Sequence, residues 1–253
     1  MTVLVGVLCS DGVVIGADSI ATSAIGMNPL VQLQTNGKIQ ILSDQVIVAA
    51  TGAIGFSQRL NFHVEQAIKG DVFKNLKINE CTTNISKRFL TDCAGSMVQQ
   101  SSRGLGFGAL LAAFIQGEPR LIEYGTQDFQ PEIKKDALFF VSMGSGQMLA
   151  DPFLAFISRV LWKDAPPTVE QGKFGVYWAL DHAIKLAPGG VGAPIKLSVL
   201  SQVNGAWVAS LLPDTQEQAQ YIVELEGHIG SFARATIEDA EATPPPIAPK
   251  MPA

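Results

Sequence analysis

Residues 2–19, TVLVGVLCSDGVVIGADS, decide the fold class. Two runs rich in valine and isoleucine, at 3–9 and 12–18, flank the polar turn SDG at 10–12. Short runs of β-branched residues that are bounded by turn residues are typical of strands, and a tight turn with glycine joins such strands into a hairpin. The sequence therefore predicts a buried antiparallel hairpin that begins directly after Thr2.

Strand and helix signals then follow in blocks. After a loop with one short strand around 30–34, further strands are expected at 38–42, 45–52, 108–115, 120–125, 137–144, 195–201 and 206–212. Helices are expected at 56–68, 85–97, 147–162, 168–186 and 214–239, the first two from apolar residues repeated every fourth position. The helix at 168 opens with TVEQ, a capping box in which Thr168 and Gln171 satisfy each other's backbone donors.

The order of these elements favours one architecture. Parallel βαβ proteins alternate single strands and helices, whereas blocks of strands and pairs of helices favour antiparallel sheets with segregated helices. Two stacked antiparallel sheets with helix pairs on both outer faces would bury every apolar stripe. We therefore predict an α+β fold, a four-layer αββα sandwich, although a simpler α+β fold also fits the order.

Composition limits the possible functions. The 253 residues are 47% hydrophobic and 16% charged, which is enough for a large core in one domain at 1–240. The tail at 241–253, EATPPPIAPKMPA, is proline-rich and is expected to be disordered. A net charge of −5 disfavours nucleic acid and anionic membranes as partners. No run of eighteen apolar residues is present, so no membrane span is expected.

Cysteine and histidine usage gives no sign of a metal or a cofactor. The three cysteines form no CxxC pair, and we expect buried, reduced thiols in a cytoplasmic protein without a secretory signal. His63, His182 and His228 lie at no metal-ligand spacing. A serine hydrolase with Ser145 and His182 is disfavoured, because GSG lacks the G-x-S-x-G elbow.

Four segments carry a resemblance to a known family. TVLVGVLCSDGVVIGADSIAT (2–22), NGKIQI (36–41), AATGAIG (49–55) and MGSG (143–146) resemble the signature segments of proteasome β subunits, in the family's order. The likeness extends over most of residues 2–212 and is strongest to the β-proteobacterial proteasome homologues. There, removal of the initiator methionine exposes the catalytic threonine. The resemblance implies the αββα fold and the N-terminal nucleophile (Ntn) hydrolase mechanism.

The resemblance also implies a role for Thr2. If Met1 is removed, as small residues at position two permit, Thr2 holds both a nucleophilic hydroxyl and a free α-amine. Such an amine has a pKa of about 7.7–8.0 in model peptides and can accept the hydroxyl proton near neutral pH. With Met1 retained, that nitrogen is an amide and cannot act as a base.

Further site residues follow by matching the family's motifs. Lys38 matches the active-site lysine that lowers the pKa of the threonine hydroxyl. Asp18 matches the carboxylate that pairs with this lysine, and a carboxylate at the buried end of a strand needs such a partner. Gly52 matches the oxyanion-hole N–H donor, and Ser145 matches a serine that hydrogen-bonds near the terminal amine. The matching substrate-binding residues are Ala21, Thr22, Ala50 and Gly52.

One segment departs from the family. Proteasome β subunits carry an Asp and a Ser in the loop after the fourth helix, whereas LAPGGVGAP (186–194) has neither. Support for the threonine by a backbone carbonyl or a cation is conceivable.

The expected activity is that of a threonine peptidase acting on peptides or unfolded chains. It would work within homo-oligomeric stacked heptameric rings, with an ATP-dependent unfoldase as a conceivable partner. Two alternatives stay open: another Ntn hydrolase acting on a small amide, and a ring-forming protein with little catalysis.

Overall fold

The computed structural model describes residues 2–25, 28–33, 37–97, 105–187 and 190–239. Contacts divide the chain into two compact units, Met1–Thr215 and Gln216–Ala253. This division falls before the last helix, and the domain end expected at residue 240 stays a prediction. The predicted disordered tail at 241–253 lies outside the described residues.

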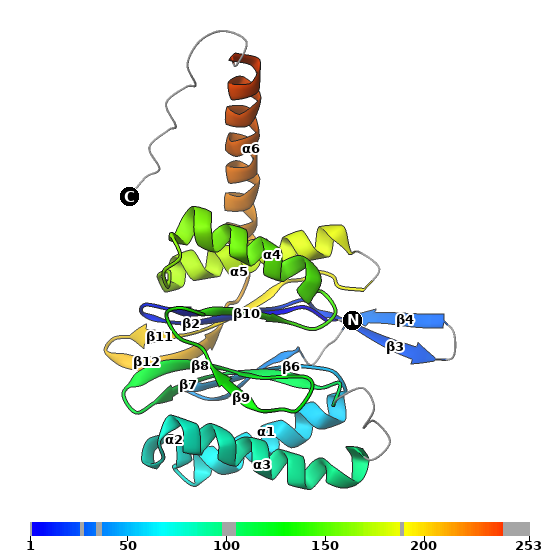
Figure 1. The fold of residues 1–253 in the computed structure, drawn as a ribbon, viewed down its shortest axis with the longest axis vertical. Helices are drawn as coiled ribbons and strands as arrows, with labels where there is room; N and C mark the ends of the chain where they lie inside the picture. Colours follow the sequence, from blue (N-terminus) through cyan, green and yellow to red (C-terminus); the bar gives the residue numbers. More distant parts are fainter. Residues whose placement is uncertain (1, 26–27, 34–36, 98–104, 188–189, 240–253) are drawn as a thin grey trace. The chain divides into compact units, whose positions relative to one another are not determined.

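Two five-stranded sheets form the centre of the first unit (Figure 1). The first sheet has the order β10-β1-β2-β11-β12, with β1 (Leu4–Cys9), β2 (Gly12–Ala17), β10 (Phe140–Met143), β11 (Lys196–Val203) and β12 (Ala206–Leu211). The second runs β5-β6-β7-β8-β9, with β5 (Ile39–Ser43), β6 (Val46–Thr51), β7 (Gly108–Ile115), β8 (Glu118–Tyr124) and β9 (Pro131–Ile133). All paired strands in both sheets are antiparallel, as predicted.

Helices cover the outer face of each sheet. Along the second sheet lie α1 (Ile54–Lys69), α2 (Val72–Asn75) and α3 (Ile78–Met97), and along the first lie α4 (Gln147–Ile157), the π-helix η1 (Ser158–Trp162) and α5 (Val169–Leu186) (Figure 1). The predicted αββα sandwich is therefore confirmed. The second unit holds the single described helix α6 (Gln216–Asp239).

The opening hairpin is buried on both faces. Every residue of β1 and β2 is buried, because α5 contacts these strands on one side and β8 contacts them on the other. A strand covered on both faces has no polar face, which explains the continuous apolar runs at 3–9 and 12–18. The register pairs Leu4 with Ala17 and Cys9 with Gly12, so the start of β1 lies beside the end of β2.

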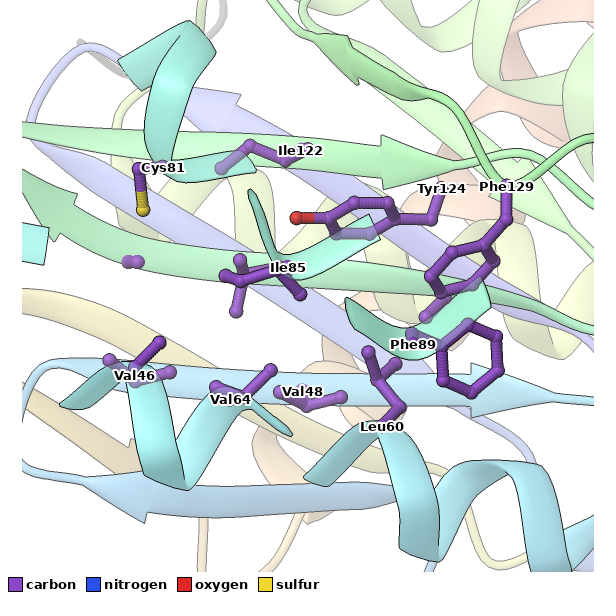
Figure 2. Packing of buried hydrophobic residues seen from close by; sticks show 14 of the residues in the cluster. Val46, Val48, Leu60, Val64, Cys81, Ile85, Phe89, Ile122, Tyr124 and Phe129 are labelled. Atoms are coloured by element: carbon purple, nitrogen blue, oxygen red, sulfur yellow. The ribbon is translucent and has the colours of Figure 1, made fainter. Parts of the chain in front are cut away.

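The core beneath α1 and α3 confirms the two predicted helical stripes. Leu60 and Val64 of α1 and Ile85 and Phe89 of α3 are buried against the second sheet (Figure 2). The ring centroids of Phe89 and Phe129 lie 4.3 Å apart. Side chains spaced by about one helical turn share one face, which lets both helices cover the sheet.

One predicted loop forms strands in the structure. The chain after β2 forms β3 (Ile20–Ile25), which pairs with β4 (Asn28–Leu33) in a separate two-stranded sheet. Only a short strand around 30–34 was predicted there, because alanine, glycine, asparagine and proline give a weak strand signal. The predicted helix 147–162 is also interrupted, since its last turn is the π-helix η1.

Two smaller predictions are confirmed. The capping box of Thr168 and Gln171 is present at the start of α5, with both hydrogen bonds formed. Cys9, Cys81 and Cys93 are buried free thiols.

Among the described helices, none combines the length and the apolar character that a membrane crossing requires.

Candidate active site

Thr2 is held by the segment that joins β10 to α4. The N–H of Thr2 donates to Ser145 Oγ at 3.0 Å, and the N–H of Gly146 donates to the Thr2 carbonyl oxygen at 3.1 Å. Gly144 has φ of +91°, and a Cβ there would lie 2.3 Å from that same carbonyl oxygen. The MGSG segment therefore packs closely on the Thr2 backbone. At position 144 any side chain would clash with the Thr2 carbonyl oxygen, so only glycine fits.

Asp18 and Lys38 form a buried ion pair next to this segment. Asp18 follows β2 and is 1% exposed, and Lys38 precedes β5 and is 9% exposed. Lys38 Nζ donates to Asp18 Oδ1, and the same oxygen accepts the N–H of Val3 at 2.9 Å. One carboxylate oxygen thus links the lysine to the residue that follows Thr2.

Burial shapes the titration of the lysine. Desolvation lowers the pKa of Lys38 from its ordinary value of 10.5, and the charge of Asp18 and its hydrogen bond partly oppose this lowering. A lysine of this kind stays charged because of its partner, and it releases its proton more readily than an exposed lysine does.

The loop after α5 reaches the same carboxylate through its backbone. Asp18 Oδ2 accepts the N–H of Gly192 and the N–H of Ile20, each at 3.2 Å. In the described part of this loop, the contact with the Asp18 carboxylate is made by a main-chain donor. Sequence reasoning missed Gly192, because any residue except proline carries such a donor.

Gly52 ends β6 in a conformation that favours glycine. Its φ is +110°, and a Cβ would lie 2.5 Å from the Gly106 carbonyl oxygen. Among the described residues, none accepts a hydrogen bond from the Gly52 N–H. The neighbouring Thr51 Oγ1 would lie 3.2 Å from a Cβ on Gly144, which places this end of β6 beside the Thr2 segment.

The predicted substrate-binding residues lie on two strands. Ala21 and Thr22 belong to β3, which in the described part of the chain pairs only with β4. Addition of a substrate strand to the other edge of β3 stays a prediction. Ala50 of β6 pairs with Ala109 of β7, and its half-buried side chain packs against the core beneath α1. Its role as a pocket floor stays a prediction.

Other site chemistries find less support. The ring of His182 stacks on Phe153 with centroids 4.1 Å apart, while Ser145 Oγ is engaged with Thr2. In the described ranges, no group of three or more His, Cys, Asp or Glu side chains is placed to hold a metal ion.

Comparison with known proteins identifies the family. The sequence model of the family described as "Proteasome subunit" matches residues 2–155, more than half of the chain. The chain belongs to the proteasome subunit family. The match begins at Thr2 and includes Asp18, Lys38, Gly52 and Ser145, all of the residues that the sequence assigned to catalysis.

A solved structure shares the fold of this proteasome-family chain. It is described as the Anbu (Gly-1) mutant from Hyphomicrobium sp. strain MC1 and superposes with a TM-score of 0.66. The alignment covers 91% of this chain and 97% of that chain, at 14% sequence identity. This likeness shows the fold alone. None of the curated proteins matches the chain.

Proposed function

We propose that this proteasome-family protein is a threonine peptidase that hydrolyses peptide bonds through an acyl-enzyme on Thr2. The observation that carries the proposal is the shared oxygen Asp18 Oδ1, which binds Lys38 Nζ and the Val3 N–H together. A buried lysine whose charge is held by a carboxylate beside a threonine favours ionisation of its hydroxyl.

The proposed reaction requires cleavage between Met1 and Thr2. The free α-amine then takes the proton of the Thr2 hydroxyl, and Oγ attacks the substrate carbonyl carbon. The charge of Lys38 favours the developing alkoxide, and the Gly52 N–H stabilises the tetrahedral oxyanion, a contribution of about 3–4 kcal/mol from such a donor. The protonated amine returns its proton to the leaving nitrogen, and water then hydrolyses the ester by the same route.

Ser145 would hold the amine during these transfers. Its hydroxyl already contacts the Thr2 nitrogen at 3.0 Å, and this nitrogen becomes the base once Met1 has gone. A hydroxyl can accept from the amine or donate to it, so Ser145 fits both protonation states.

We further propose that an extended peptide adds to the open edge of β3. Main-chain hydrogen bonds from Ala21 and Thr22 would align the scissile bond, and Ala50 would leave room for the side chain before that bond. By family membership, we propose homo-oligomeric stacked heptameric rings with the active sites inside, served by an ATP-dependent unfoldase. Native mass spectrometry tests the ring number.

The activity is tested by comparing substrates and variants. Fluorogenic peptides and small acylated amides are offered to the processed protein, to Thr2→Ala and to Thr91→Ala, a control at an exposed threonine of α3. We expect peptide hydrolysis in the wild type and in Thr91→Ala and none in Thr2→Ala. Preference for the small amides would instead favour an Ntn amidase, and no turnover of either would favour the ring-forming alternative.

A further inference from the structure

Asp18 is bound on both of its oxygens, and its two sides differ. Oδ1 faces the catalytic groups, where it accepts from Lys38 Nζ and the Val3 N–H. Oδ2 faces away from them and accepts from the N–H groups of Ile20 and Gly192. Two hydrogen bonds on each oxygen fix the plane of the carboxylate, and the Gly192 N–H is one of these four donors.

Ser19 ties the loop that carries Gly192 to the end of β2. The Ser19 N–H donates to the Gly192 carbonyl oxygen at 2.9 Å, and Ser19 Oγ donates to the Pro194 carbonyl oxygen at 2.5 Å. Ser19 is only 5% exposed. These bonds hold the loop at Gly192 and Pro194, and the Gly192 N–H donates to Asp18 Oδ2 at 3.2 Å.

We propose that Ser19 is a positioning residue, which holds the Gly192 N–H against Asp18 and thereby directs Asp18 toward Lys38. The inference rests on the proposed threonine peptidase function. It assigns the support of the active site, which the family's loop Asp and Ser provide, to Ser19 and the main-chain N–H of Gly192. Ser19 acts through Asp18 and does not touch the reacting atoms.

The packing of Gly192 supports this role independently. A Cβ on Gly192 would lie 2.0 Å from Ile20 Cδ1 and 3.0 Å from Ile20 Cγ1. The loop therefore packs tightly on the Ile20 side chain, and a side chain at 192 would displace either the end of Ile20 or the loop itself. Close approach of one backbone to another group is a common reason for glycine at a site.

The hydroxyl of Ser19 is tested by Ser19→Ala against a matched control. Ser86 of α3 is also buried and donates to a distant carbonyl oxygen, that of Phe129, at 2.7 Å. Ser86→Ala therefore loses the same kind of bond in the other helical layer. We expect kcat for a peptide substrate to fall about tenfold in Ser19→Ala, with KM unchanged, and neither to change in Ser86→Ala.

A second measurement does not depend on turnover. The pKa of Lys38 is followed by side-chain NMR in both variants and in Gly192→Ala, which crowds the loop against Ile20 and leaves the Ser19 side chain unchanged. Because only Asp18 raises the pKa of Lys38 against burial, we expect it to fall in Ser19→Ala and Gly192→Ala and to stay unchanged in Ser86→Ala.

The outcomes separate this inference from the proposed function. An unchanged Lys38 pKa in Ser19→Ala, or in Gly192→Ala should Ser19→Ala fail to fold, would overturn the positioning role. A wild-type protein without peptidase activity would overturn the proposed function, while the Lys38 titration would still decide the role of Ser19.

Discussion

In the proposed mechanism, the protonation states of Lys38 and of the Thr2 α-amine determine activity. The α-amine of a processed Thr2 must lose its proton to act as a base, and its ordinary pKa is about 7.7–8.0. Lys38 must keep its proton, and burial lowers its pKa from 10.5. Activity is therefore expected at pH values above the pKa of the α-amine and below the pKa of Lys38.

We therefore predict a bell-shaped pH profile of kcat. Activity should rise as the amine deprotonates near pH 8 and fall as Lys38 deprotonates, below the range of an ordinary lysine. In Lys38→Arg the alkaline loss of activity should move to higher pH, because arginine stays protonated across the whole range in which lysine titrates. Steady-state kinetics across pH measures both limbs, and an alkaline limb unmoved in Lys38→Arg would contradict the assignment.

The ion pair also predicts a stability effect. Lys38→Met leaves Asp18 buried without its countercharge and should cost about 3–5 kcal/mol of unfolding free energy. The double variant Asp18→Asn, Lys38→Met should recover much of this loss, because no uncompensated charge remains. Urea denaturation of the single and double variants measures the coupling, and strictly additive losses would argue against the pair.

Among the helices and strands, sequence patterns predicted the elements with a regular apolar repeat and missed those without one. The stripes with Leu60 and Phe89 predicted helices on an apolar sheet, since periodicity reports which face is buried. In the hairpin β3–β4, the strand predicted around 30–34 overlaps β4, whereas β3 was missed because small residues dominate it.

The candidate site divides in the same way. A buried carboxylate such as Asp18 requires a cation, so its partner Lys38 could be inferred from residue types. The contact of Gly192 could not, because it uses a main-chain group.

The capping box of α5 gives a prediction at this scale. Thr168→Ala removes the acceptor of the Gln171 N–H and should lower the unfolding free energy by about 1 kcal/mol. Thr168→Ser keeps the hydroxyl and should lose little. Thermal or urea unfolding measures the difference, and equal losses in the two variants would show that the cap hydroxyl is not the cause.

At the scale of the whole molecule, the sandwich gathers the site from distant parts of the chain. Thr2 precedes β1, Asp18 follows β2, Lys38 precedes β5 and Gly52 follows β6. Ser145 lies in the turn before α4, and Gly192 lies in the loop after α5. Antiparallel pairing accounts for part of this, since it sets Leu4 opposite Ala17 and Met143. In the proposed mechanism, removal of Met1 would then supply the free amine of Thr2.

Intact mass spectrometry after treatment with a peptide epoxyketone tests that step. This inhibitor closes a ring on a hydroxyl and an amine of the same residue, so it requires a processed N-terminal threonine. We predict that the wild-type protein lacks Met1 and gains one inhibitor per chain, and that Thr2→Ala gains none. A processed wild-type protein that forms no adduct, or a protein that uniformly retains Met1 in the cell, would contradict the threonine mechanism.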